Sequence, residues 1–155
     1  MTDENQPSVP VVLASKLRPP EARPTAVDRS PLVQLLEEAS PGALRVVIAP
    51  TGWGKSEVVA AWFERHEGPV AYVALDEKDA DVSRLWAHLL SAVHRATSVA
   101  IDDLLGALRA PGIDVVGEVV EPLLARLEDV SCTVVLEDLH LAGSAEVQES
   151  VEALA

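Results

Sequence analysis

The chain has 155 residues, of which 48% are hydrophobic and 3% aromatic. This is the length of one domain with enough apolar residues for a core, which excludes an intrinsically disordered chain. Twelve lysines and arginines stand against 25 acidic residues, and the net charge of −13 repels nucleic acid and anionic lipid. This stretch is therefore not predicted to be a DNA-binding module.

The targeting and redox signals are few. A single cysteine, Cys132, excludes an intramolecular disulfide framework and a cysteine-based zinc cluster. No apolar run approaches the roughly 20 residues of a membrane span. Residues 1–10 are polar and acidic, unlike the apolar region of a signal peptide. The sequence predicts a soluble cytoplasmic protein without a membrane partner.

Two regions are predicted along the chain. Residues 1–28 carry five of the eleven prolines, which fix φ and remove a backbone donor, so this region is predicted to be an extended N-terminal arm. The folded domain is predicted over 29–155. It begins with a helix that Asp28 caps, with Pro31 in the first turn, and Pro41-Gly42 ends that helix.

Strands and helices are predicted to alternate in the rest of the chain. Short β-branched apolar runs indicate strands at 44–49, 70–75 and 132–136. Helical spacing of apolar residues indicates helices at 55–66, after the cap Asp81, and at 101–108, 115–127 and 145–155. Near-continuous apolar strands between helices are typical of an α/β fold with a parallel sheet covered on both faces.

The strongest chemical motif is Ala49-Pro50-Thr51-Gly52-Trp53-Gly54-Lys55-Ser56, between a predicted strand and a predicted helix. Glycines allow backbone N–H groups to turn toward phosphate oxygens, and the helix N-terminus adds a favourable dipole. The lysine can reach the β and γ phosphates, and the serine hydroxyl can bind Mg²⁺. The loop departs from G-x-x-x-x-G-K-[ST] at Ala49. Trp53 is expected either to pack on a neighbouring surface or to shield bound phosphates.

A second motif is the apolar strand that ends in Glu137-Asp138. In proteins with a phosphate loop, a strand of this kind brings an acid to the magnesium ion directly or through water. Carboxylate oxygens suit Mg²⁺. The plain alternative is that the two acids begin a solvated loop, and the upstream phosphate loop favours the magnesium interpretation.

The motifs in this order resemble the MalT-type ATP-dependent transcription regulators, a family of STAND-class signalling ATPases with a LuxR-type DNA-binding domain. The likeness runs from Ser15 nearly to the end of the chain. The matching segments are Ser15–Pro20 with Arg23-Pro24, Val27-Asp28-Arg29, the loop 49–56 with Ala60-Ala61-Trp62, the stretch Ala71–Asp76 with Asp79 and Arg84-Leu85-Trp86, and Val134–Leu141. In the family the stretch at Tyr72–Asp76 is W-L-S-L-D and the later one is L-V-L-D-D-Y-H-L.

The resemblance implies a P-loop NTPase three-layer sandwich that binds ATP or ADP with Mg²⁺ as a switch. Glu137 and Asp138 would be the catalytic acids, and Ser56 and Glu137 would hold Mg²⁺. The nucleotide would contact Arg29 and the loop residues Thr51, Gly52, Trp53, Gly54, Lys55, Ser56 and Glu57. The resemblance further implies self-association of the intact protein, and DNA binding only through a C-terminal domain outside this sequence.

Two departures from the family shape the expectations. Glu137 stands where the family has its first aspartate, so the magnesium geometry is expected to shift. The family continues for several hundred residues, including the sensor arginine and the strand between the phosphate-loop and acidic strands. We therefore expect a truncated domain, slow or absent ATP hydrolysis, marginal stability and self-association. The alternative function is a truncated or degenerate interaction module that does not hydrolyse ATP.

The remaining candidate residues have plainer interpretations. His66, His88, His94 and His140 lack metal-ligand spacing and are predicted to be structural or solvated. Cys132 is predicted to be buried and inert. Asp76 and Asp79 follow a strand, so they are expected either to face the nucleotide or to serve as caps.

Overall fold

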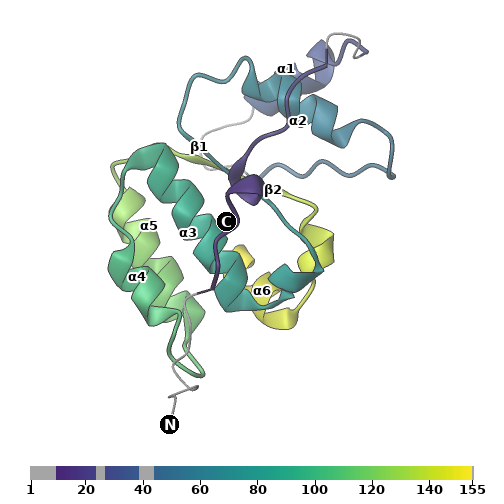
Figure 1. The fold of residues 1–155 in the computed structure, drawn as a ribbon. Coiled ribbons are helices and arrows are strands. Elements are labelled where there is room, and N and C mark those ends of the chain that lie inside the picture. The colour runs from purple at the N-terminus through teal and green to yellow at the C-terminus, as the bar shows by residue number, and fades with distance from the viewer. Residues whose placement is uncertain (1–9, 24–26, 39–43, 155) are drawn as a thin grey trace. The chain divides into compact units, whose positions relative to one another are not determined.

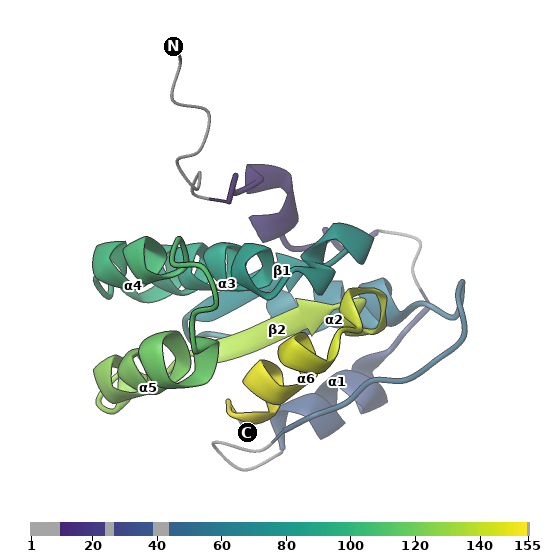
Figure 2. The same cartoon turned by 90° about the horizontal axis from the view of Figure 1, so that it is seen from below.

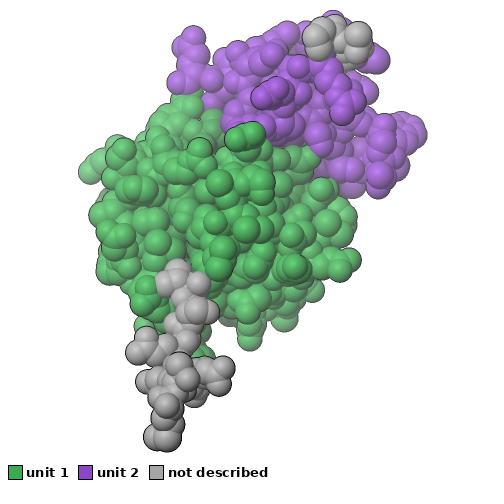
Figure 3. All heavy atoms as spheres, viewed as in Figure 1, with its two compact units in different colours: residues 1–18, 68–154 green, residues 19–67, 155 purple. Residues whose placement is uncertain are grey.

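The computed structural model describes residues 10–23, 27–38 and 44–154, which form two compact units (Figure 3). Unit 1 contains the described residues up to 18 and those from 68 onward, and unit 2 contains those from 19 to 67. Unit 2 is therefore inserted in the sequence of unit 1.

Unit 2 holds two helices, α1 (Ser30–Glu37) and α2 (Lys55–Phe63), which pack against each other (Figure 1). Asp28 caps α1 as predicted, because its Oδ1 accepts a hydrogen bond from the Ser30 backbone N–H at 2.9 Å. Pro31 lies in the first turn, where its missing N–H costs nothing. The predicted stop at Pro41-Gly42 lies outside the described residues.

The strand predicted at 44–49 is wrong for this structure. Residues 44–50 form no regular element, and Leu44, Val46 and Ile48 are exposed by 74%, 68% and 88%. A strand needs a neighbour to pair its backbone groups, and β-branched composition alone does not supply one. The run leads into the phosphate loop as irregular chain.

Unit 1 is built on a parallel sheet of two strands, β1 (Val70–Ala74) and β2 (Thr133–Glu137). The register pairs Tyr72 with Val135 and Ala74 with Glu137. Ala71 and Val73 turn one face of β1 into the apolar core, where α3 (Val82–Thr97) packs on the strand (Figure 2). The mixed α/β class and the parallel pairing are confirmed. The three-layer P-loop sandwich stays a prediction.

Helix α3 is the centre of the core of unit 1. Asp81 caps it as predicted, since its Oδ1 accepts from the Arg84 N–H at 2.9 Å. The apolar residues that were predicted to share one face are all fully buried, namely Leu85, Trp86, Leu89, Leu90 and Val93. Trp86 Nε1 donates to Ser150 Oγ at 2.8 Å, which ties α3 to α6 (Ala145–Glu152).

The other predicted helices of unit 1 are present with one local difference. The helix at 101–108 is α4 (Asp102–Ala107), but the segment 115–127 divides into a π-helical turn, η3 (Val116–Val120), and α5 (Glu121–Leu127). The Glu121 N–H bonds to the Val116 carbonyl, five residues back. Pro122 explains the wider turn, because it lacks an N–H and its ring displaces the carbonyl four residues earlier. The short 3-10 turns are η1 (Ala14–Leu17), η2 (Glu77–Ala80) and η4 (Leu139–Ala142).

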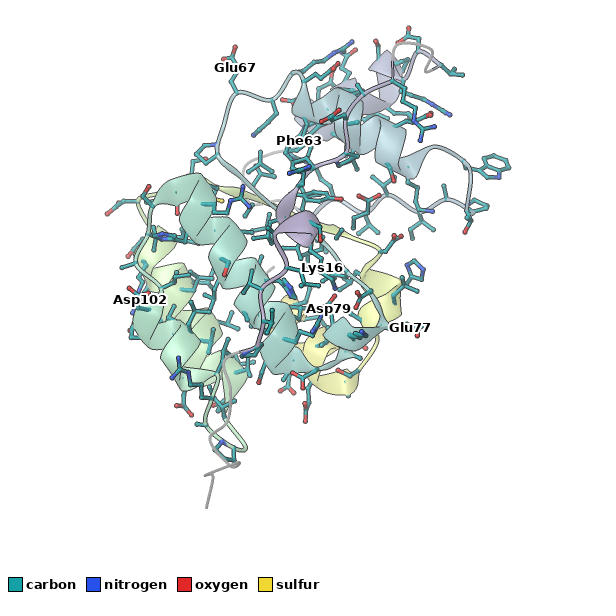
Figure 4. The ribbon with its side chains drawn as sticks, in the orientation of Figure 1. Lys16, Phe63, Glu67, Glu77, Asp79 and Asp102 are labelled. Atoms are coloured by element: carbon teal, nitrogen blue, oxygen red, sulfur yellow. The ribbon has the colours of Figure 1, made fainter. Side chains whose placement is uncertain are left out.

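The turn η1 lies in the stretch predicted as an extended arm, and it packs on β1 and α3. Leu17 joins the apolar core. Lys16 is 8% exposed and forms an ion pair with the fully buried Asp79, as Figure 4 shows. The segment 14–17 of the predicted arm is thus part of unit 1 and packs on its core. No helix in the described parts of the chain is long and apolar enough to cross a bilayer.

Candidate functional site

The phosphate loop lies in unit 2 and leads directly into α2, which begins at Lys55. Gly52 and Gly54 have φ angles of 84° and 79°, the left-handed region that glycine adopts without steric cost. Both predicted loop glycines are therefore used for their backbone freedom. Trp53 N donates to Pro50 O at 3.3 Å, which closes a tight turn between them.

Lys55 folds back over its own loop. Its Nζ donates to Ala49 O at 2.7 Å and lies 3.4 Å from Pro50 O. These neutral carbonyls are weaker partners for an ammonium group than phosphate oxygens, because an anionic acceptor adds the attraction between opposite charges to the hydrogen bond. Lys55 is therefore held at the loop by contacts that an anion would exceed.

Arg29, predicted to lie near the adenosine, contacts the same loop. Its Nη2 is 3.5 Å from Trp53 O, and a Cβ at Gly54 would come within 2.9 Å of that nitrogen. Among the residues that the structure describes, the buried Arg29 Nε has no hydrogen-bond partner. A buried N–H without a partner and a glycine against which the guanidinium packs both fit a site that takes an anionic ligand.

The remaining loop residues lie open to solvent. Thr51 and Ser56 are exposed, Glu57 is half-buried in the first turn of α2, and Trp53 is 69% exposed. Trp53 is therefore not buried against the described residues, which gives no support to packing on a neighbouring surface, one of its two predicted placements. Its role as a cover over phosphates stays a prediction, as do the ligand roles of the other loop residues.

The acidic pair lies in unit 1, at the end of β2. Glu137 is half-buried, and its Oε2 accepts a hydrogen bond from the Tyr72 hydroxyl. Burial and the Glu137 carboxylate both raise the pKa of Tyr72, so the phenol keeps its proton and remains a donor. The sequence analysis missed Tyr72. Its only signal was a polar group within the apolar run 70–75.

Asp138 differs from Glu137 in conformation and exposure. It is exposed and takes the left-handed backbone conformation, with φ 57° and ψ 35°. Aspartate tolerates this region better than most residues, yet it remains uncommon outside glycine. A less favourable conformation held directly after an acidic strand end is typical of functional sites.

Asp76 and Asp79 have structural roles here. Asp76 caps η2 through the Lys78 N–H, and the Asp79 carboxylate accepts from the Asp76 N–H, which completes a capping box. Lys16 and Arg84 also contact Asp79. Of the two predicted alternatives, the structure supports the cap.

His88 is structural, as predicted, and the sequence analysis missed Lys16 as a member of the same cluster. The Leu13 N–H donates to His88 Nε2 at 3.1 Å, and His88 Nδ1 lies 2.9 Å from Arg84 O, so Nδ1 carries the proton. Burial lowers the pKa of His88. Lys16, which the sequence analysis assigned only to the arm, joins Asp79 across 63 positions of the chain.

Comparisons with known proteins give distant relatives. The chain is 28% identical to the HTH-type transcriptional regulator MalT of Vibrio parahaemolyticus over 141 residues, which cover 90% of this chain and 16% of that protein. It is also 28% identical to the serine/threonine-protein kinase PknK of Mycobacterium tuberculosis over 157 residues, which cover 97% of this chain and 14% of that protein. No family model and no solved structure matches. The chain thus spans about one-seventh of the length of these relatives and has a distant, MalT-like relationship to them.

Proposed function

We propose that this chain is a nucleotide-binding switch domain of a regulatory protein, and that it takes ATP or ADP with Mg²⁺. One observation carries the proposal. The loop 49–56 combines two glycines in the left-handed conformation with a helix that begins at its lysine, and it is contacted by Arg29, whose buried Nε has no hydrogen-bond partner among the described residues. Backbone donors, a helix N-terminus and two cations at one loop are suited to a polyphosphate.

The residues take the following roles in the proposal. Lys55 and the N–H groups of 51–57 hold the phosphates, and Arg29 lies beside the nucleotide. Ser56 and Glu137 supply oxygen ligands for Mg²⁺, and Asp138 is the second acid. These are the hard oxygen donors that Mg²⁺ prefers. The bound ion would neutralise phosphate charge, and the protein residues orient the nucleotide.

The relatives have different named activities, which supports a switch role for the part that they share with this chain. One is named as an HTH-type transcriptional regulator and another as a protein kinase, and each matches nearly the whole of this chain with a small part of its own length. We propose that the shared part senses nucleotide in the cytoplasm and controls self-association. Any DNA contact would be made by other domains, since the charge of −13 disfavours it here.

The alternative function is an interaction module that binds nucleotide without hydrolysing it. The contact that favours it is the Tyr72 hydroxyl on Glu137, because a carboxylate that accepts a hydrogen bond is a weaker base toward water. On either alternative we expect slow turnover from this chain. Phosphoryl transfer depends on cations placed at the transferred phosphate, and an arginine there is worth ~10³–10⁵ in rate.

Calorimetric titration of the 155-residue chain with ATP and Mg²⁺ tests the proposal. Lys55→Ala should weaken binding about tenfold to a hundredfold, because a hydrogen bond to a charged group contributes ~1.5–3 kcal/mol. Lys78→Ala, at an exposed lysine of unit 1, is the matched control and should leave binding unchanged. Equal ATP affinity in the wild type and Lys55→Ala would refute the assigned role of the loop.

A further inference from the structure

The sheet brings Tyr72 and Glu137 together across the two strands. Tyr72 is opposite Val135, and Glu137 is two residues further along β2. Side chains two positions apart on a strand share a face, and diagonal neighbours across strands are within reach of an aromatic side chain. The parallel register therefore places the phenol below the acidic strand end, and its hydroxyl meets Glu137 Oε2.

Tyr72 and Glu137 differ in conformational freedom. Tyr72 is 4% exposed and lies in the middle of β1, so its ring is fixed by the strand and by packing. Glu137 is the last residue of β2, half-buried, with three side-chain torsions. A fixed donor thus restrains a longer and more flexible acceptor. One carboxylate oxygen, Oε2, takes this bond.

Side-chain length matters at both positions. Phenylalanine at 72 would fill the same space without a donor. Aspartate at 137 would end one methylene closer to its own strand and further from the phenol. These are also two positions where the sequence departs from the motifs quoted above, with tyrosine for tryptophan and glutamate for aspartate. The hydrogen bond joins the two departures.

We propose that Tyr72 is a positioning residue that holds the Glu137 carboxylate in the orientation in which it serves Mg²⁺. This inference rests on the proposed function. Asp138, exposed and in the left-handed conformation, is not held by this bond. The nucleotide itself is assigned to the loop 49–56 and Arg29, so removal of the Tyr72 hydroxyl should change the response to magnesium through Glu137 and leave metal-free nucleotide binding as it was.

The first test is calorimetric ATP binding by the full 155-residue chain over a range of Mg²⁺ concentrations. Tyr72→Phe should raise the Mg²⁺ concentration needed for half of the full affinity gain by about tenfold, with metal-free ATP affinity unchanged. Glu137→Gln should also raise it. Tyr72→Phe in the Glu137→Gln background should add nothing further, because partners that act as one unit are non-additive.

Ser150→Ala is the matched control. It removes another buried hydrogen bond of unit 1, from Trp86, and should lower stability without changing the magnesium response. An unchanged magnesium response in Tyr72→Phe, or an equal effect in the Glu137→Gln background, would overturn the positioning role while ATP binding still stood. Wild-type chain that binds no ATP would instead refute the proposed function and this inference with it.

The second test does not need a variant at 72. Tyr72 is the one tyrosine of the chain, so labelling tyrosine at Cζ with ¹³C gives a single NMR signal that reports the phenolic hydrogen bond. Glu137→Asp and Glu137→Gln should both move this signal, and Ser150→Ala should not. Glu137→Asp should also raise the magnesium requirement, although aspartate is as good a ligand. A signal and a magnesium response that Glu137→Asp leaves unchanged would contradict the proposal.

Discussion

At the scale of single residues, the two loop glycines differ in what a methyl group would meet. At Gly52 a Cβ would have nothing within 4 Å, whereas at Gly54 it would lie 2.9 Å from Arg29 Nη2 and 3.0 Å from Glu57 Oε2. Both positions have a positive φ, which costs a residue with a Cβ roughly 1–2 kcal/mol. Alanine at Gly52 would therefore meet backbone strain alone, whereas alanine at Gly54 would meet both backbone strain and a steric contact.

We expect Gly52→Ala to weaken ATP binding modestly and Gly54→Ala to weaken it further, because only the second also displaces Arg29. Calorimetric titration gives the two affinities, and thermal unfolding gives the accompanying loss of stability. Gly106→Ala is the control, since Gly106 lies in α4, has no positive φ and has open space at its Cβ. Equal affinities for Gly52→Ala and Gly54→Ala would contradict the contact assigned to Arg29.

The lowered pKa of His88 predicts that the folding stability of the chain depends on pH. Its pKa is lowered in the folded chain, first by burial, and an unfolded histidine titrates near 6.5. As the pH falls through about 6.5, the unfolded state therefore binds more protons than the folded state. The contribution of neutral His88 to folding stability is complete above that pH and is lost as the pH falls toward the lower pKa of the folded state. Asp79 faces the ring and favours its protonation, whereas Lys16 and Arg84 oppose it.

Denaturant unfolding at about pH 7.5 and about pH 5.5 checks this expectation. The wild type should lose stability on acidification, and His88→Gln, which can keep one donor and one acceptor, should lose much less. The comparison with His88→Gln removes the contribution of the other titrating groups. A wild-type stability that rises between the higher and the lower pH would show that the sign is wrong.

At the scale of elements, the buried ion pair between Lys16 and Asp79 is one of the contacts that attach η1 to the core. Removal of one partner of a buried pair costs roughly 3–5 kcal/mol, because the other charge remains buried. Lys16→Met keeps the aliphatic length but leaves Asp79 with Arg84 as its remaining side-chain cation. We expect Lys16→Met to lower the free energy of unfolding by about this amount and to increase hydrogen exchange at residues 10–18.

Lys78→Met is the control for that measurement, because Lys78 is an exposed lysine in the adjacent turn η2. Exposed ion pairs contribute little, so this variant should stay within about 0.5 kcal/mol of the wild type. If the two variants were equally stable, the Lys16–Asp79 pair would not anchor the arm.

The elements that the sequence predicted well are those whose signal is local. Apolar spacing and the cap Asp81 specify α3, and the runs at 70–75 and 132–136 form paired strands. The run 44–49 has a similar composition but forms no strand in the described part of the chain, so local propensity misled. Contacts between distant positions had no local signal: the pairs Lys16–Asp79 and Tyr72–Glu137 join residues 63 and 65 positions apart. For the same reason, the loop was predictable and the partner of Glu137 was not.

At the scale of the whole molecule, the run 44–48 presents apolar side chains to solvent and forms no regular element. Leu44, Val46 and Ile48 are exposed by two-thirds or more. Exposed segments rich in apolar and β-branched residues tend to pair with another copy. We expect the purified chain to self-associate, with a sedimentation coefficient that rises with protein concentration.

Val46→Lys together with Ile48→Lys should suppress this association, because charge blocks edge pairing. Leu124→Lys, at a single apolar residue of α5 that is 39% exposed, is the control and should associate like the wild type. A double variant that associates as strongly as the wild type would show that another surface is responsible.

The two attachments of the arm also set an order of folding events. The bonds Leu13–His88 and Lys16–Asp79 join positions 75 and 63 residues apart, and unit 2 lies inside the loop that they close. Loop closure costs chain entropy before the contact is gained, so contacts of this separation form late. During synthesis, unit 2 emerges from the ribosome before α3 does. Unit 2 must therefore begin to fold before Leu13 and Lys16, on its N-terminal side, have their partners His88 and Asp79 available.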